Sequence, residues 1–242
     1  MKLIAYVPCG YPTLEESLEL AGRYAAWGIG ALEISLPPSD PYLEAPFIRK
    51  RMLRALAECG DYDRYLEQIG RFAREHPHVE ILLLLFEEVI RKIGAQRLAV
   101  FYHRYGIRYF ICVDLKDPAL HRVFAENGVK LSRPVRIDLA EEDIARCFGD
   151  EVGFVYLQAF PKEGERPAAG METPAKRIAA LRARGLRVPI YCGVGVKTPA
   201  LAGEIREAGG DGVFLGSALL TLAEEAPSLL AERIEEFRAA AD

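Results

Sequence analysis

The stretch LEISLPPSDPYLEAP, residues 32–46, contains the repeating unit on which the fold is built. It opens as an apolar, strand-like run and passes through four prolines toward a segment of helical period. Glu33 lies inside the apolar run, and Glu44 follows eleven residues later, beyond most of the prolines. A loop that only turned the chain would need neither acid nor so much stiffening by proline, whose ring fixes φ. The stretch therefore predicts a strand, a functional loop and a helix in that order.

The same alternation of short apolar runs and longer helical segments continues along the whole chain. Most of the runs are apolar on both faces, which is typical of strands buried in a parallel sheet. The strands are expected at residues 3–7, 31–36, 80–86, 108–115, 129–133, 153–158, 188–193 and 212–216. Eight βα units predict an α/β protein, a single-domain (β/α)8 TIM barrel over residues 1–242, with a doubly wound sheet as the alternative.

The helical segments carry their own start and stop signals. Thr13 and Glu16 have the spacing of a capping box at the start of the first helix, and several helices end in glycine. The helices are expected at residues 13–28, 46–58, 62–75, 87–106, 117–128, 140–149, 173–185, 198–210 and 226–241.

The composition narrows the class of protein. Half of the 242 residues are hydrophobic, which is ample for one large core, and 27% are charged. The net charge of −4 argues against nucleic acid or an anionic membrane as partner, because both reward basic patches. A phosphorylated small molecule stays open as a ligand, since helix N-termini bind phosphate without net positive charge.

The cysteines and the first residues indicate the compartment. Five cysteines are scattered with no CxxC pair and no Cys/His cluster of zinc spacing, so no structural metal is expected. No cofactor is expected either. The apolar run before Pro8 is too short for a signal peptide or a membrane span. We therefore expect a reduced, cytoplasmic protein whose first strand begins near residue 3.

Two glycine-rich stretches, CGVGVKTP (192–199) and FLGSALL (214–220), follow the last two expected strands. Glycine lets the backbone approach an anion, and each stretch opens a helix whose first amides can bind phosphate. Barrels of this type commonly build a phosphate site after strands 7 and 8. The alternative is that these glycines only tighten the turns. The residues expected to bind phosphate are Gly193, Gly195, Gly216 and Ser217.

The two glutamates are candidates for proton transfer. A carboxyl buried at the mouth of a barrel has a raised pKa and exchanges protons near neutral pH, although Glu33 could instead face a helix or pair with an arginine. Glu44 alone would be interpreted as a solvated loop residue. It becomes a functional candidate because of the rigid prolines around it and the presence of Glu33. Asp114, at the end of the fourth expected strand, and Tyr156, late in the sixth, should reach the same mouth.

The stretch at 32–46 resembles the strand and loop signature of the tryptophan synthase α subunit family, commonly written LE[LI]GxPFSDPxADGP. The opening YVPCGYPTLEESLEL resembles the first strand and turn of that family, with Gly10 and Pro12 in place, and MLRAL at 52–56 matches its next helix. The glycine pairs resemble its phosphate site. The resemblance extends over nearly the whole chain.

This resemblance implies a lyase of tryptophan biosynthesis that cleaves indole-3-glycerol phosphate into indole and glyceraldehyde 3-phosphate by a retro-aldol reaction. It implies that Glu33 transfers the protons and that Glu44 binds the indole nitrogen. It also implies substrate contacts from Tyr6, Phe86 and Tyr156, and a tryptophan synthase β subunit as partner.

The chain departs from the family at several positions. Glu44 replaces an aspartate and Ala45 a glycine, while Phe86 and Glu88 stand where the family often has Tyr-x-Asn. The segment AFPKEGERPAAG (159–170) lacks the threonine of the family's R-x-G-x-T-G loop, and no N-terminal helix is expected before the first strand.

Two alternatives to this lyase stay open: a related barrel that acts on another phosphorylated substrate, and a non-catalytic phosphate-binding partner of a β subunit. Indole-glycerol phosphate synthase and phosphoribosyl isomerases share the glycine pairs. They lack the E-x3-P-x-S-D-P loop, and the former also needs a lysine at a strand end, where this sequence has none.

Overall fold

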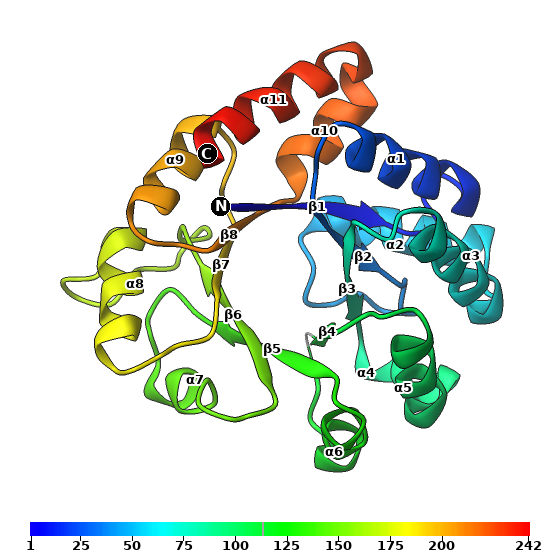
Figure 1. Cartoon of the computed structure of the whole chain (residues 1–242), viewed down its shortest axis with the longest axis horizontal. Helices are drawn as coiled ribbons and strands as arrows, with labels where there is room; N and C mark the ends of the chain where they lie inside the picture. Colours follow the sequence, from blue (N-terminus) through cyan, green and yellow to red (C-terminus); the bar gives the residue numbers. More distant parts are fainter. Residues whose placement is uncertain (113) are drawn as a thin grey trace. The chain divides into compact units, whose positions relative to one another are not determined.

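The computed structural model describes residues 1–112 and 114–242. Eight parallel strands follow one another around a closed barrel in the order of the sequence, with helices between them (Figure 1). The predicted (β/α)8 fold class is thereby confirmed, and the doubly wound alternative is wrong because the sheet has no free edge. The strands are β1 (Lys2–Pro8), β2 (Ala31–Ser35), β3 (Glu80–Leu85), β4 (Tyr109–Cys112), β5 (Lys130–Val135), β6 (Val152–Gln158), β7 (Ile190–Gly193) and β8 (Gly212–Leu215).

Two strands are shorter than the sequence predicts by two residues or more, whereas β2, β3 and β8 each end one residue early. β4 runs to Cys112, whereas the expected strand extended to residue 115; residue 113 lies outside the described residues, and Asp114 already belongs to the following loop. β7 begins at Ile190 instead of residue 188, because Pro189 has no N–H to give to the sheet.

The helices lie where the helical pattern predicts them, with two interruptions and one shorter helix, α7, which spans Glu141–Ala145 where 140–149 is expected. Gly94 has φ +96, which a right-handed helix cannot accommodate, so the expected helix at 87–106 is two helices. The last expected helix begins with a short 3-10 turn, η1 (Pro227–Leu229). The α-helices are α1 (Leu14–Ala26), α2 (Pro46–Glu58), α3 (Tyr62–Glu75), α4 (Glu87–Ile93), α5 (Ala95–Arg104), α6 (Pro118–Glu126), α7 (Glu141–Ala145), α8 (Pro174–Ala183), α9 (Pro199–Glu207), α10 (Ser217–Glu225) and α11 (Leu230–Ala241).

Side chains cap several of these helices and so fix where they start. The Thr13 hydroxyl accepts a hydrogen bond from the Glu16 amide at 3.2 Å, which confirms the predicted start of α1. The Thr198 hydroxyl caps α9 in the same way, through the amide of Leu201. α10 has no such cap, so its first amides are not used by a side chain of its own N-cap residue.

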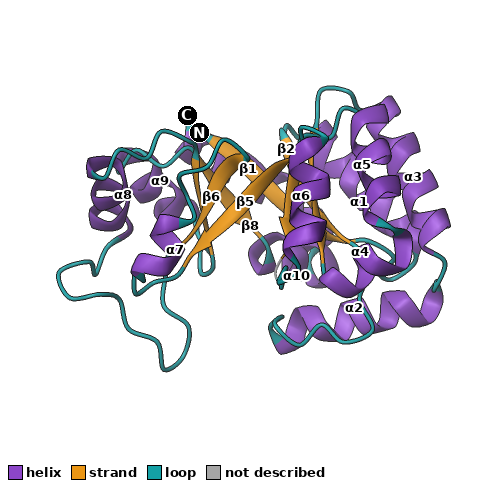
Figure 2. Ribbon diagram, turned by 90° about the horizontal axis from the view of Figure 1, so that it is seen from below, coloured by secondary structure: helices purple, strands orange, loops and turns teal. Residues whose placement is uncertain are grey.

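The contacts divide the chain into two compact units, residues 6–131 and residues 1–5 with 132–242. In the first unit β2, β3 and β4 pair side by side (Figure 1), and α1 packs beside α3 (Figure 2). In the second, β8 lies between β7 and the start of β1, and α9 packs against α11 (Figure 1). Across the described residues, no helix is long and apolar enough to cross a membrane.

Candidate active site

Glu33 is a buried acid in the middle of β2. Its side chain is only 6% exposed, and its neighbours Leu32 and Ile34 are fully buried. Burial, and after it the negative charge of Glu44, raises the pKa of Glu33 to about 8. The carboxyl therefore carries a proton near neutral pH, as a general acid must.

Glu44 lies in loop 2, which we define as residues 36–45, between β2 and α2. Its amide donates to the carbonyl of Pro41 at 3.1 Å, which closes a turn, and its side chain is half-buried. Its charge acts on Glu33 and also on Tyr6 of β1, where it helps to raise the pKa of the phenol. The structure thus brings the two predicted acids into one electrostatic cluster.

Tyr6 belongs to this cluster through a contact that the sequence analysis did not consider. Its hydroxyl lies 2.9 Å from the hydroxyl of Ser35, and both side chains are buried. Burial first, and then Glu44, holds the pKa of Tyr6 well above its usual range, so the phenol stays protonated. The available signal was Ser35 itself, which stands where the family signature has glycine.

Arg51, like Ser35, was not predicted to belong to the site. It lies on α2, is 8% exposed, and places its guanidinium 3.5 Å from the centre of the Phe47 ring. It donates to the Phe47 carbonyl at 2.7 Å, and its positive charge lowers the pKa of Tyr6. Nothing in the basic run RKR at 49–51 distinguishes the buried arginine from its exposed neighbours.

Loop 2 is attached to the segments that follow β3 and β4. The Ser39 amide donates to Glu88 of α4 at 3.0 Å, and the Tyr42 hydroxyl donates to Asp114 at 3.3 Å. Phe86, a predicted substrate contact, is 1% exposed and meets the ring of Tyr42 edge-on, with centroids 6.2 Å apart. These contacts fix the loop that carries Glu44.

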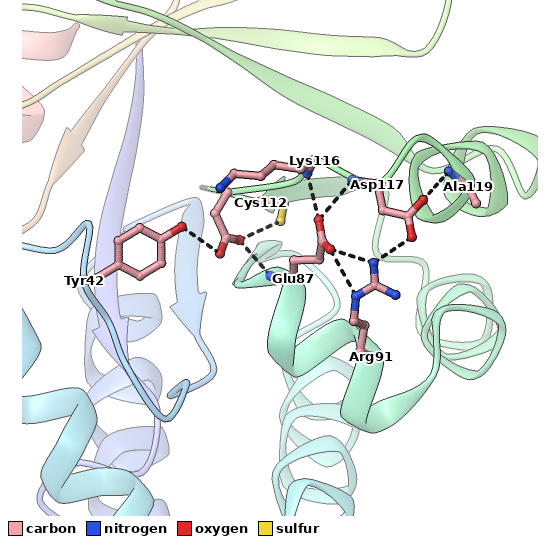
Figure 3. Close-up of polar contacts among 8 residues, drawn as sticks. Tyr42, Glu87, Arg91, Cys112, Lys116, Asp117 and Ala119 are labelled. Carbon is pink, nitrogen blue, oxygen red and sulfur yellow. Dashed lines mark hydrogen bonds and ion pairs between the residues drawn. The ribbon is translucent and has the colours of Figure 1, made fainter.

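Asp114, which the sequence predicts only to lie at the mouth of the barrel, binds a backbone amide and neighbouring side chains through its carboxylate. It accepts the first amide of α4, from Glu87, at 2.7 Å and so caps a helix that its own N-cap residue leaves uncapped. Glu87 in turn accepts the amides of Lys116 and Asp117 at 2.7 and 3.0 Å (Figure 3). Arg91 joins Glu87 to Asp117, which completes the network.

The first glycine turn lies after β7. A side chain at Gly193 would collide with the ring and hydroxyl of Tyr156, the third predicted substrate contact, whose ring also packs on Phe214 with centroids 4.5 Å apart. Gly195 has φ +86, and an added Cβ would lie 2.8 Å from Phe160. Val194 has φ +63, which is rare for a β-branched residue and marks a strained turn.

The second glycine turn lies after β8. β7 and β8 pair with Cys192 opposite Val213, so the two turns leave the same edge of the sheet. Gly216 is the N-cap residue of α10 with φ −76, a value open to any residue, so this glycine is not required by its φ. Ser217 begins α10 and is exposed. The uncapped start of α10 is a suitable place for an anion.

Loop 6, residues 159–173 between β6 and α8, is held by contacts that differ from the family's threonine motif. Arg177 of α8 is fully buried and donates to the carbonyls of Met171 and Ala159, the former at 2.5 Å. At the start of the loop, Gln158 donates to the carboxylate of Glu165, which also accepts the amide of Lys162 at 2.9 Å. Sequence alone gave no sign that Arg177 was buried.

The closed ring of parallel strands with interleaved helices defines the chain as a (β/α)8-barrel protein. The family described as tryptophan synthase alpha chain matches residues 1–242. The chain belongs to this family.

The chain is similar to individual relatives and solved structures. The tryptophan synthase alpha chain of Burkholderia cenocepacia (strain HI2424) is 27% identical over 252 aligned positions, covering 99% of this chain and 91% of that protein. A solved structure from Aquifex aeolicus VF5 has a TM-score of 0.84 at 26% identity, covering 99% of this chain and 92% of that one. The tryptophan synthase subunit alpha of Legionella pneumophila str. Paris shares the fold, with a TM-score of 0.82 at 24% identity, covering 100% of this chain and 92% of that one.

Proposed function

We propose that this chain is a lyase that cleaves indole-3-glycerol phosphate into indole and glyceraldehyde 3-phosphate. The observation that carries the proposal is Glu33, a buried carboxyl whose pKa lies near 8 beside the second acid, Glu44. The family membership of the chain supports the same reaction. Residues 1–242 would work as one domain.

The chemistry requires one proton to move from an oxygen to a carbon. Protonated Glu33 gives its proton to C3 of the indole ring, while the carboxylate of Glu44 stabilises the positive charge that develops at the ring N–H. The side-chain hydroxyl next to C3 then returns a proton to Glu33 as the carbon–carbon bond breaks. The electron pair of that bond restores the aromatic ring, and the hydroxyl-bearing carbon becomes the aldehyde. Glu33 ends the cycle protonated.

The phosphate of the substrate would bind at the two glycine turns. Gly195, at φ +86, would let the backbone approach the phosphate, and the amides of Gly216 and Ser217 at the start of α10, which no N-cap side chain uses, would donate to it. Gly193 contributes by leaving room for Tyr156. Tyr6, Phe86 and Tyr156 would contact the indole ring and the glycerol chain.

A β subunit is the expected partner. The structure from Pyrococcus furiosus that shares this fold is described as a tryptophan synthase complex, with a TM-score of 0.80 at 24% identity. In this chain Tyr42 and Leu43 of loop 2 are each 48% exposed, so loop 2 offers apolar surface for such a contact. Mass measurement of the mixture with a β subunit tests this; a monomer that persists at micromolar concentration would indicate a stand-alone protein.

The decisive experiment is to incubate the purified protein with indole-3-glycerol phosphate and measure indole, with and without a β subunit. Glu33→Gln, which keeps the shape of the side chain, should lower the rate about 10²-fold or more. Retention of most activity in this variant would remove Glu33 from the mechanism. Tight ligand binding without indole release, with or without the β subunit, would instead support a non-catalytic or differently specific protein.

A further inference from the structure

The hydroxyl groups of Tyr6 and Ser35 form a pair near the proposed proton-transfer residue, Glu33, whose charge helps to raise the pKa of Tyr6. Side chains alternate along a strand, so Glu33 and Ser35 project from the same face of β2. Ser35 lies one step nearer loop 2, about 7 Å along the strand. The two side chains sit opposite Leu82 and Leu84 of β3, which gives the pair an apolar flank.

One of the two hydroxyl groups in this pair has a hydrogen-bond donor that the pair itself does not use. Each hydroxyl carries one O–H, and the 2.9 Å contact between Tyr6 and Ser35 uses only one of the two. Within residues 1–112 and 114–242, neither hydroxyl makes another hydrogen bond. Both side chains are more than nine-tenths buried, at 4% and 1% exposure. A buried donor is normally satisfied, so an acceptor on a ligand is expected next to it.

We propose that the hydroxyl pair of Tyr6 and Ser35 donates a hydrogen bond to the substrate oxygen that becomes the aldehyde oxygen. This inference rests on the proposed function, in which Glu33 must reach both C3 and the hydroxyl beside it. As that hydroxyl gives its proton to the carboxylate of Glu33, negative charge develops on the oxygen. A fixed donor aimed at this oxygen stabilises the transition state more than the bound substrate.

The surroundings suit a neutral donor. Burial and the nearby acids hold the pKa of Tyr6 far above neutral, so its O–H is retained throughout the working pH range. The signature of the family has glycine at the position of Ser35, so this pair adds a polar contact that a glycine cannot supply. The chain would therefore select ligands with an oxygen at this carbon.

The experiment compares two ligands and two variants. Indole-3-propanol phosphate lacks both side-chain hydroxyls of indole-3-glycerol phosphate but keeps the ring and the phosphate. Tyr6→Phe should lower kcat/KM for indole-3-glycerol phosphate about 10²-fold, mainly in kcat, and change the Kd of indole-3-propanol phosphate less than about twofold. Ser35→Ala removes the other hydroxyl of the pair and should also lower kcat/KM for indole-3-glycerol phosphate. Tyr102→Phe, at another wholly buried tyrosine in the same unit, is the matched control and should change neither quantity.

The outcomes separate the two proposals. If wild type releases indole and both Tyr6→Phe and Ser35→Ala keep its kcat/KM, the hydroxyl pair has no part in catalysis while the proposed function stands. If both variants lose affinity for the two ligands equally, the pair only braces β1 against β2, and the inference is again wrong. If wild type neither binds nor cleaves indole-3-glycerol phosphate, the proposed function fails and the inference fails with it.

Discussion

The Tyr42 hydroxyl on loop 2 donates to the Asp114 carboxylate at 3.3 Å, which joins segments 72 residues apart in the chain. Because the same carboxylate caps α4 through the amide of Glu87, loop 2 is attached to a fixed point of the barrel. Tyr42 is separated from Glu44 by one residue, so the position of the acid depends on this attachment.

Removal of the Tyr42 hydroxyl should therefore affect turnover more than stability. Tyr42→Phe keeps the ring contact with Phe86, and an exposed hydrogen bond contributes only about 0.5–1.5 kcal/mol. We expect a fall of about 3–10-fold in kcat, since small displacements of a catalytic group are costly. Steady-state kinetics and thermal unfolding measure the two effects. Leu43→Ala, at a neighbour of equal exposure, serves as control, and an identical loss of kcat in both variants would show that the Tyr42 hydroxyl does not position Glu44.

The raised pKa of Glu33 predicts how stability depends on pH. A carboxyl with an ordinary pKa of 4.5 in the unfolded chain and about 8 in the folded protein binds its proton more tightly when folded. Its contribution to stability is complete below about pH 4.5 and is lost as the pH rises through about 8, about 5 kcal/mol in all. Glu33→Gln should remove this slope, which urea unfolding between pH 5 and 9 would reveal. Parallel curves for wild type and variant would show that the pKa is not raised.

The pH dependence of the lyase rate should also follow the protonation of Glu33. Protonated Glu33 is the form that gives a proton to C3, so kcat/KM should fall as the pH rises through about 8.

Glu44 should tolerate shortening but not removal. Glu44→Asp retains the charge that acts on Glu33 and should keep or improve turnover, whereas Glu44→Ala should lower it about 10-fold or more. Kinetics of the three proteins on indole-3-glycerol phosphate provide the measurement. Equal rates in all three proteins would show that Glu44 takes no part in the mechanism.

Gly216 offers a test of the phosphate site, because it is the N-cap residue of α10 and its φ of −76 lies outside the left-handed region. Gly216→Val should weaken binding of sulfate or glycerol phosphate at least about 10-fold with little change in the free energy of unfolding, since the side chain would crowd the start of α10. Titration of both ligands and denaturant unfolding check this. Gly195→Val, at φ +86 and close to Phe160, should in contrast cost stability as well. Unchanged affinity in Gly216→Val would place the phosphate elsewhere.

Arg177 should matter for stability through loop 6. Arg177→Met removes the buried guanidinium that donates to the loop carbonyls of Ala159 and Met171, and it should destabilise the protein by about 2–4 kcal/mol. Arg184→Met removes an exposed ion pair with Glu141 and should lower the free energy of unfolding by less than about 1 kcal/mol. Similar losses in the two variants would show that the buried contacts contribute little.

The sequence predicted the strands and the acids because those signals are local. The apolar runs, the prolines around loop 2 and the glycine turns each depend on a few neighbouring residues. The contacts of Ser35 with Tyr6 and of Tyr42 with Asp114 could not be predicted, because each joins distant segments through a single hydrogen bond. The buried state of Arg51 and Arg177 also escaped prediction, since a run of basic residues on a helix is normally solvated.

The network around Glu87 has a consequence for how this family member can change. Glu87 accepts the amides of Lys116 and Asp117, while Glu88 on the same helix accepts that of Ser39. Two adjacent residues thus hold both loop 2 and the segment after β4. An insertion or deletion in loop 2 or in the segment after β4 would have to be matched by changes at the start of α4. These three segments should therefore evolve together. Their amide protons should also exchange with solvent as one group.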